Sequence, residues 1–332
     1  MQHQRRFWFL VYPDLNKAVG GIKQIHRVSE IIEGLGYFSC LVQEQAGFRP
    51  HWFDSNVNTT SRSEFFERSD LDPQTDIIVL AETFVPLVPS LFPGIPKIIF
   101  NQNASYTFGL PSKTIYKPSA ITAIYRHQDI SQVWCVSRSD YNFLVRGLDL
   151  PVSKVFRVVN AIDFDHLPIQ PVEKKLQICY MSRKNSLDSA CVLNILSRKR
   201  WLKDWKFLEI KNLPHSEVIS VMRDSMIFLS FGHPEGFGLP VAEALASQCS
   251  IVGYDGIGGR ELFDLSSNFG LSRVVPFGDW IAFVDATFEI YSEFTLYPDL
   301  FRHRLESMSS FVREQYSACA MKQSILEALN ML

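Results

Sequence analysis

Two glutamates in a glycine-rich segment are the residues best suited to bind a polar ligand. Glu235 and Glu243 lie in residues 231–246, which read Phe-Gly-His-Pro-Glu-Gly-Phe-Gly-Leu-Pro-Val-Ala-Glu-Ala-Leu-Ala. The glycines allow the backbone to approach a ligand where a Cβ atom would clash. Pro240 suits the first turn of a helix, whose free N–H groups and positive dipole end favour an anion. The segment therefore predicts a strand–loop–helix corner that binds a negatively charged group.

The spacing of the two carboxylates limits the chemistry that they can share. Eight helical residues span about 12 Å, so Glu235 and Glu243 cannot share one proton as a catalytic dyad. Val241 and Leu245 form the apolar stripe of the helix, and Glu243 projects about 200° around the axis from Val241. Glu243 is therefore expected to face water or a cleft. A ligand that contacts both glutamates must be long, and a sugar nucleotide has that length.

The same segment resembles the donor-binding signature of family 4 retaining glycosyltransferases, which have the GT-B fold. The resemblance is carried by Glu235-x7-Glu243 within Glu-Gly-Phe-Gly-Leu-Pro-Val-Ala-Glu-Ala-Leu-Ala. It implies that Glu235 contacts the hexose and that Glu243 binds the ribose hydroxyls. It also implies that four backbone N–H groups bind the hexose and phosphate, those of Gly236, Phe237, Gly238 and Leu239. The alternative interpretation is an ordinary corner with a solvated glutamate.

A basic pair supports this interpretation. Arg183 and Lys184 follow residues 176–181, which are predicted to be the first strand of a second domain. A diphosphate leaving group needs positive charge directed at its oxygens, and an arginine and a lysine supply a fork and a point charge. Family 4 members usually carry an Arg and a Lys several residues apart here, so the adjacent pair leaves open which residue binds the phosphate. With Glu235, these two are the predicted catalytic residues.

Further candidates lie in the first half of the chain. Gly20 and Gly21 precede a predicted helix and resemble the glycine-rich first loop of the family, which implies contact with the donor phosphate or sugar; a plain tight turn is the alternative. Asn101 and Asn103 follow a predicted strand, where their amides would hydrogen-bond to sugar or acceptor hydroxyls or cap the next turn. His127 is a candidate because a histidine in the first domain of this family often contacts the sugar; an incidental surface histidine is the alternative.

Short apolar runs alternate with helical patterns, which predicts parallel sheets covered by helices. In the first half the predicted strands cover residues 6–12, 38–43, 76–81, 97–101, 132–137 and 154–159. In the second half they cover residues 176–181, 206–210, 226–230 and 250–254. Helices are predicted at residues 22–35, 187–203, 216–223, 239–247 and 318–332. A polar, proline-bearing segment at 163–175 separates the halves.

The expected fold is α/β and GT-B, with two doubly wound Rossmann-like domains that face a central cleft. We expect an N-terminal Rossmann-like domain on the acceptor side at residues 1–162. A C-terminal Rossmann-like domain, which binds the nucleotide-sugar donor, is expected at 163–310. A C-terminal helix region at 311–332 is expected to pack back on the N-terminal domain. Ligands in such sheets bind at the carboxyl ends of the strands.

Composition and charge exclude several classes of protein. The 332 residues include 33 Lys and Arg against 35 Asp and Glu, a formal net charge of −2, so a large basic footprint for nucleic acid is missing. With 46% hydrophobic and 20% charged residues, the chain is predicted to be globular. The six cysteines are scattered without a C-x-x-C pair, which predicts reduced core residues.

The apolar segments are short or interrupted. The run near the start is too short for a signal peptide, and residues 77–100 contain Glu82, Lys97 and four prolines, which prevents an uninterrupted span of about 20 apolar residues. We therefore expect a cytoplasmic protein with at most peripheral membrane association.

The resemblance implies that a hexose passes from a nucleotide-diphosphate sugar to an acceptor hydroxyl with its anomeric configuration retained. The acceptor would be a glycan, a lipid-linked molecule or a small molecule. No metal or other cofactor is expected, because no Asp-x-Asp triad lies in a suitable loop and no histidines cluster at ligand spacing. Three alternatives remain open: a non-catalytic nucleotide-sugar-binding subunit, a GT-B epimerase and a nicotinamide-dependent dehydrogenase. The dehydrogenase is disfavoured because residues 13–21 lack G-x-G-x-x-G.

Overall fold

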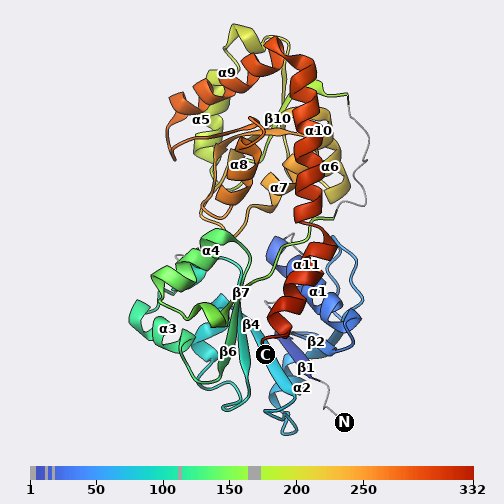
Figure 1. Ribbon diagram of the computed structural model, residues 1–332, viewed down its shortest axis with the longest axis vertical. Coiled ribbons are helices and arrows are strands. Elements are labelled where there is room, and N and C mark those ends of the chain that lie inside the picture. The colour runs from blue at the N-terminus through green and yellow to red at the C-terminus, as the bar shows by residue number, and fades with distance from the viewer. Residues whose placement is uncertain (1–4, 12–13, 17–18, 111–113, 164–172) are drawn as a thin grey trace. The chain divides into compact units, whose positions relative to one another are not determined.

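The computed structural model describes residues 5–11, 14–16, 19–110, 114–163 and 173–332. The chain forms two compact units, a first of Met1–Ala161 with Cys319–Leu332 and a second of Ile162–Ala318 (Figure 1). The predicted boundary at residue 162 thus differs from the observed one by one residue, whereas the boundary predicted at 310 falls inside helix α10 (Pro298–Gln315). Most of the predicted linker, residues 164–172, lies outside the described residues.

The first unit is built on a seven-stranded parallel sheet in the order β3-β2-β1-β4-β5-β6-β7. Its strands are β1 (Arg6–Leu10), β2 (Phe38–Gln43), β3 (Asn58–Ser61), β4 (Asp76–Ala81), β5 (Lys97–Asn101), β6 (Ile130–Cys135) and β7 (Val155–Arg157). The chain runs from β1 to β2 and β3 on one side and then returns to β4 on the other. The strand order therefore reverses between β1 and β4.

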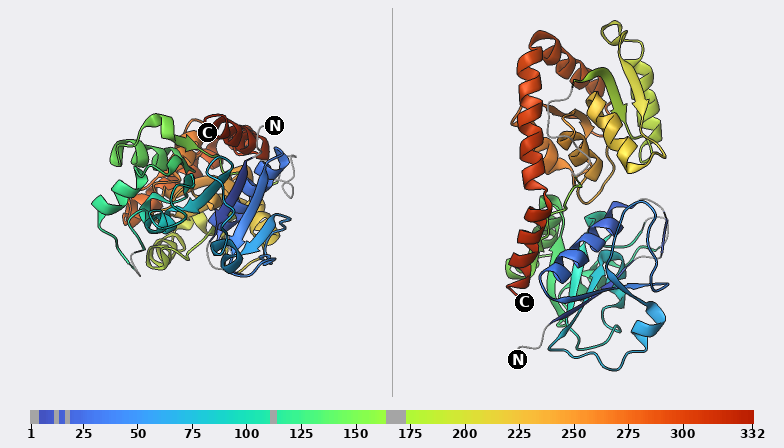
Figure 2. Two further views of the ribbon diagram at one scale, coloured as in Figure 1. Left: turned by 90° about the horizontal axis from the view of Figure 1, so that it is seen from below. Right: turned by 90° about the vertical axis from the view of Figure 1, so that its right-hand side faces the viewer.

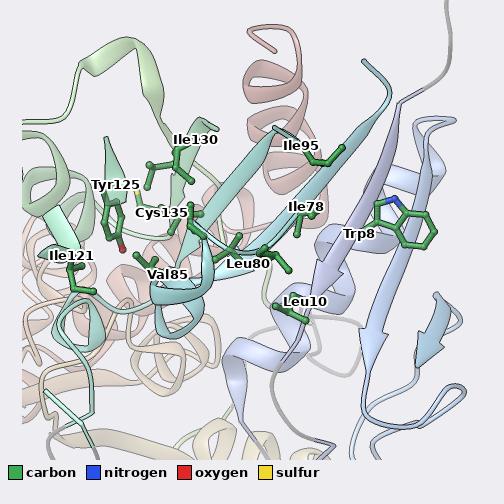
Figure 3. Close-up of a cluster of buried hydrophobic side chains, with 14 of the residues drawn as sticks. Trp8, Leu10, Ile78, Leu80, Val85, Ile95, Ile121, Tyr125, Ile130 and Cys135 are labelled. Atoms are coloured by element: carbon green, nitrogen blue, oxygen red, sulfur yellow. The ribbon is translucent and has the colours of Figure 1, made fainter. Parts of the chain in front are cut away.

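Both faces of the central strands are buried in the first unit. Phe7 and Phe9 of β1 face one side, while Trp8 and Leu10 belong to an apolar cluster on the other. Figure 3 shows this second cluster, which includes Tyr125 and other side chains from several elements. The sequence of these strands is nearly continuously apolar because helices cover both faces of a parallel sheet.

The helices of the first unit follow the predicted pattern in part. They are α1 (Gly20–Gly34), α2 (Arg62–Phe66), α3 (Pro118–Tyr125), α4 (Arg138–Asn142) and α11 (Ala318–Leu329). The 3₁₀ turns η1 (Glu82–Leu87), η2 (Ala104–Tyr106) and η4 (Val152–Lys154) and the π-helical turn η3 (Phe143–Gly147) complete the unit. Helix α11 is tied to the sheet by two long-range bonds: Gln132 Nε2 donates to Ala328 O at 2.8 Å, and Val159 N donates to Ser324 Oγ at 3.0 Å.

The second unit contains a five-stranded parallel sheet in the order β12-β11-β10-β8-β9. Its strands are β8 (Lys175–Tyr180), β9 (Lys206–Glu209), β10 (Ser225–Phe231), β11 (Ser250–Tyr254) and β12 (Ser272–Val274). The chain leaves β8 for β9 on one side, and β10, β11 and β12 follow on the other. The order therefore reverses between β8 and β10.

Helices surround this second sheet in the views of Figure 2. They are α5 (Ser186–Leu196), α6 (His215–Asp224), α7 (Leu239–Ala246), α8 (Arg260–Ser267), α9 (Trp280–Leu296) and α10, with the turn η5 (Arg200–Leu202). The helix predicted at 187–203 is thus α5 followed by η5. Helix α10 holds the end of α7, because Ser309 Oγ donates to Ala246 O at 2.7 Å and Arg313 Nη2 donates to it at 2.9 Å.

The prediction of buried cysteines is correct for four of the six. Cys40, Cys135, Cys179 and Cys249 are buried, whereas Cys191 is half-buried and Cys319 is exposed. Among the described helices, none combines the length and the apolar character that crossing a bilayer requires.

Candidate functional site

The candidate site lies at the carboxyl end of the second sheet, where the strand order reverses between β8 and β10. Residues 181–185 follow β8 and residues 232–238 follow β10, so both loops emerge at the same edge. Open α/β sheets bind ligands at such a switch point. The structure therefore places the two most informative sequence segments at the position where ligand binding is expected.

An ion pair joins the two loops. Lys184 Nζ donates to Glu235 Oε2 at 2.5 Å, and the Glu235 side chain is only 17% exposed. Arg183 is exposed, and within the part of the chain that the structure describes it has no ion-pair or hydrogen-bond partner. The structure thus brings Lys184 and Glu235 together and leaves Arg183 apart from them.

Asn185 fixes the loop that carries the basic pair. Its Nδ2 donates to Phe231 O at 3.0 Å and to Gly232 O at 2.8 Å. Asn185 occupies the N-cap position of α5, yet its side chain does not cap the helix. Sequence reasoning missed this residue, although an asparagine between a predicted strand and a helix is a recognisable signal. Its role is to hold the β8–α5 loop against the end of β10.

A second glycine-rich loop, which follows β11 and contains Gly256 and Gly258, packs against the Glu235 loop. A Cβ atom on Gly258 would lie 2.1 Å from Glu235 O, and one on Gly256 would lie 3.0 Å from Glu235 Oε1. Gly256 also has a φ of +60°, in the left-handed region that favours glycine. Glycines at these positions allow the two loops to touch backbone to backbone, which positions the carboxylate of Glu235.

The N-terminus of α7 is open. Gly238, the N-cap, has a φ of +91° and provides no side-chain cap. Among the described residues, the N–H groups of Gly236, Phe237, Gly238 and Leu239 have no hydrogen-bond partner. Such groups at a helix start attract an anion. The Phe237 side chain is buried and packs on Tyr316, with ring centroids 5.0 Å apart, so only the backbone of Phe237 is available to a ligand.

Glu243 is held by a histidine that sequence reasoning missed. His215, the first residue of α6, places Nε2 3.0 Å from Glu243 Oε1. Val241 and Leu245 are buried, as the helical spacing predicts, while the Glu243 side chain is 15% exposed. Glu243 Oε2 has no partner among the residues that the structure describes. One carboxylate oxygen is therefore oriented by His215 and the other is left for a ligand.

Gly20 and Gly21 form the start of α1, beside the reversal between β1 and β4 in the first unit. A Cβ atom on Gly21 would lie 2.8 Å from Gln102 Oε1, and Gln102 Nε2 donates to Gly21 O at 2.9 Å. The glycine thus admits the side chain of Gln102. The contact with Gln102 is sufficient reason for a glycine at position 21. A role of Gly21 in donor binding stays a prediction.

The two asparagines have structural partners. Asn101 is buried, and its Oδ1 accepts from Tyr125 OH at 2.7 Å. Asn103 Oδ1 accepts from Ser105 N at 3.1 Å and so caps η2, which is the capping alternative that the sequence left open. These partners explain both amide oxygens without a ligand, and contact of Asn101 and Asn103 with sugar or acceptor hydroxyls stays a prediction.

His127 accepts a hydrogen bond within its own loop. His127 precedes β6, so it lies at the amino end of the sheet, where its Nδ1 accepts from Asp129 N at 3.2 Å. Asp129 in turn pairs with Lys97, the first residue of β5, at 3.0 Å. Asn101 lies at the other end of β5, and the switch point lies at that carboxyl edge. His127 therefore lies at the edge opposite to the one where ligand binding is expected, and its contact with a sugar stays a prediction.

A buried carboxyl group, Glu82, lies at the switch point of the first unit. It directly follows β4, and its Oε2 accepts from Gln102 N at 2.9 Å. Burial raises the pKa of Glu82 to about 7, against the opposing effect of backbone hydrogen bonds from residues that include Gln102. The sequence shows Glu82 only as an interruption of an apolar stretch. A carboxylate directly after a buried strand is the signal that could have found it.

Glu82→Gln is expected to remove a pH dependence of stability. The pKa of Glu82 rises from 4.5 to about 7 in the folded state, so the native protein holds this proton where the unfolded chain loses it. Its ionisation therefore destabilises the fold as pH rises from 4.5 through 7. The free energy of unfolding decreases by on the order of 3 kcal/mol over this pH range. Urea unfolding at about pH 5 and about pH 8 should show a smaller difference in the variant than in the wild type; equal differences would contradict this assignment.

No cluster of three or more His, Cys, Asp or Glu residues that could hold a metal ion occurs within the described ranges. Lys184 supplies positive charge at the candidate site, with the N-terminus of α7 beside it.

Comparison with known proteins adds relatives of known activity. No protein-family profile matches the chain. An alpha-1,6-glucosyltransferase of Actinobacillus pleuropneumoniae serotype 7 (strain AP76) is 30% identical over 140 residues, which cover 40% of this chain and 39% of that protein. The GtfA subunit of a UDP-N-acetylglucosamine–peptide N-acetylglucosaminyltransferase of Streptococcus parasanguinis is 30% identical over 96 residues, 27% of this chain and 19% of that protein. The matches thus span about two fifths and one fifth of these relatives.

Solved structures match both units together. A glycosyltransferase from Rickettsia africae ESF-5 superposes with a TM-score of 0.70 and 14% identity over 97% of each chain. Anabaena HepE in complex with UDP and glucose gives 0.68 and 10% identity over 99% of this chain and 100% of its own. WaaG, a glycosyltransferase involved in lipopolysaccharide biosynthesis, gives 0.65 and 9% identity over 96% of this chain and 98% of its own. The chain therefore has the GT-B fold, with two Rossmann-like domains.

Proposed function

We propose that this chain is a glycosyltransferase that transfers a hexose from a nucleotide-diphosphate sugar to an acceptor hydroxyl. The observation that carries the proposal is the Lys184–Glu235 pair beside the open N-terminus of α7, at the switch point of the second unit. An ammonium group and free N–H groups at one edge suit a diphosphate. The names of both curated relatives, a glucosyltransferase and a subunit of an N-acetylglucosaminyltransferase, support the same reaction class.

Each part of the donor has a matching group in the proposal. The N–H groups of residues 236–239 and the charge of Lys184 bind the diphosphate. Glu235 binds the hexose, and the free oxygen of Glu243 accepts from a ribose hydroxyl while His215 holds the other oxygen. A uridine nucleotide is the proposed donor, because solved HepE complexes contain UDP and UDP-glucose and one curated relative is named for UDP-N-acetylglucosamine.

The proposed reaction is retaining, of the family 4 type, and independent of metal. The bond from the sugar C1 to the phosphate oxygen breaks, and a bond from C1 to the acceptor oxygen forms on the same face. The departing phosphate takes the proton of the acceptor hydroxyl. The protein stabilises the charge that develops on the diphosphate, which is the effect expected of preorganised donors and cations. The acceptor, a glycan, a lipid-linked molecule or a small molecule, is assigned to the first unit.

Glu243→Ala is expected to weaken donor binding while the protein stays folded. A saturating nucleotide sugar stabilises the native state by about 2.7 kcal/mol at 100 times its Kd, so it raises the melting temperature of the wild type. The panel comprises UDP-, GDP-, ADP- and TDP-sugars, with UDP-glucose expected to act. Glu243→Ala should need at least about tenfold more ligand, the effect of losing one hydrogen bond to a charged group.

The matched control is Glu314→Ala, an exposed glutamate on α10. This variant should respond to the ligand as the wild type does. Equal ligand response in Glu243→Ala would remove Glu243 from the site, and a wild type that binds no member of the panel would refute the proposed function. Transfer is then read from UDP release that depends on an acceptor, and retention from the anomeric proton of the product; turnover without acceptor would indicate an epimerase.

A further inference from the structure

A strongly basic segment follows α5 in the second unit. Residues 198–206 contain five cationic side chains and one acidic side chain, in a chain whose net charge is −2. Arg198, Arg200 and Lys203 are exposed, and Lys199 is half-buried. The acidic residue, Asp204, lies 3.9 Å from Lys203. The positive charge of this segment is therefore concentrated on the surface and only partly balanced by its own acidic residue.

Aromatic side chains lie directly beside these cations. The Trp201 ring is half-buried and lies 5.2 Å from the Phe288 ring and 4.9 Å from the Tyr291 ring, both on α9. Phe288 itself is 47% exposed. Helices α5 and α9 are neighbours (Figure 1), and Trp201 joins the basic segment to α9 through its contacts with Phe288 and Tyr291. We call Arg198, Lys199, Arg200, Trp201, Lys203 and Phe288 the basic–aromatic surface.

An apolar stripe extends this surface toward the start of α9. Ile281 is 63% exposed and lies two helical turns before Phe288, and Phe277 is 66% exposed. An open pocket of about 510 Å³ is lined by both side chains and by Ile195 of α5, which lies three residues before Arg198. Two exposed carboxylates interrupt the stripe: Asp279, which also lines the pocket, and Asp285. A partner for this surface must bury the exposed apolar side chains and also pair with the adjacent cations.

We propose that the basic–aromatic surface docks the chain on a membrane that contains anionic lipids. Each lysine or arginine near such a surface contributes about 1 kcal/mol of attraction, and tryptophan and phenylalanine insert between headgroups and acyl chains. Ile281 and Phe277 cannot pair with phosphates, but they fit the acyl boundary. A nucleic acid backbone would satisfy the cations and leave these apolar groups in water. The proposal is independent of the proposed function.

The test is co-sedimentation of the full chain with vesicles. Wild type should bind vesicles of phosphatidylcholine mixed with phosphatidylglycerol, less at high salt, and should bind pure phosphatidylcholine weakly. Arg200→Glu/Lys203→Glu should reduce binding at least about tenfold, because four units of charge change next to the headgroups. Phe288→Ser should also reduce binding, since it removes an inserting ring without a change of charge.

The matched control is Lys117→Glu/Lys322→Glu, which makes the same charge change at exposed positions of the first unit. It should bind as the wild type does, and melting curves should show that all variants are folded. The proposal is overturned if the wild type binds no vesicles, if neutral vesicles bind equally well, or if the control loses as much binding as Arg200→Glu/Lys203→Glu. Binding to an acidic polymer without binding to vesicles would likewise overturn it.

Discussion

Lys184→Met is expected to lower kcat/KM for the nucleotide sugar by about 10²–10³-fold, the usual cost of removing one preorganised charge from a transition state. Lys184 Nζ lies 2.5 Å from Glu235 Oε2 at the switch point of the second sheet. Methionine keeps much of the length of the lysine stem and removes the charge. The loss should therefore appear in transfer kinetics while the melting temperature of the free protein changes little, because the lysine is 40% exposed.

Arg183→Met is the matched control, since the neighbouring arginine is exposed and does not pair with Glu235. We expect it to lower kcat/KM by less than about tenfold, because only Lys184 is held at the Glu235 loop by an ion pair. A larger loss in Arg183→Met than in Lys184→Met would identify the arginine as the group that meets the diphosphate. If neither variant changed the kinetics, the basic pair would have no role in the reaction.

Gly258→Ala is expected to destabilise the second unit by about 1–3 kcal/mol and to weaken donor binding. The new Cβ atom would lie 2.1 Å from Glu235 O and 2.3 Å from Gly236 C. Backbone atoms cannot give way as a flexible side chain does, so the loop that carries Glu235 must move. Thermal melting and nucleotide-sugar affinity, measured on the same sample, should therefore decrease together.

Gly34→Ala provides the control for this substitution. Gly34 is the last residue of α1, and nothing lies within 4 Å of the Cβ atom that alanine would add. Alanine in a helix is better by roughly 0.5–1 kcal/mol than glycine, so this variant should be as stable as the wild type or slightly more stable. If Gly258→Ala behaved like Gly34→Ala, the tight contact between the two loops would not be needed for the site.

The central strands could be predicted because their environment leaves a local signal. The ranges 38–43, 76–81, 97–101 and 250–254 coincide with β2, β4, β5 and β11. Parallel strands that are buried on both faces are continuous apolar runs, which can be recognised without knowledge of their neighbours. The strand β3, with the sequence NTTS, is polar and lies at the sheet edge, so it carries no such signal.

The site was predictable in its residue types and less so in its contacts. The segment around Glu235 and the basic pair are recognisable because a strand, a glycine loop and a helix start follow one another in sequence. Their partners are not local: Asn185 bonds to residues 46 and 47 positions away, and His215 meets Glu243 across 28 positions. Such pairs form only when separate strands and helices are packed together.

The sequence by itself determined the alternation of strands and helices, the residue types of the Glu235–Glu243 segment and the presence of a nearby basic pair. Only the tertiary structure decided that Lys184, rather than Arg183, pairs with Glu235, that Glu243 is held by His215, and that His127 lies at the far edge of its sheet. Periodicity and turn chemistry depend on a few neighbouring residues, so they can be recognised in the sequence. Strand order and side-chain pairing depend on contacts between distant residues, and these exist only in the folded protein.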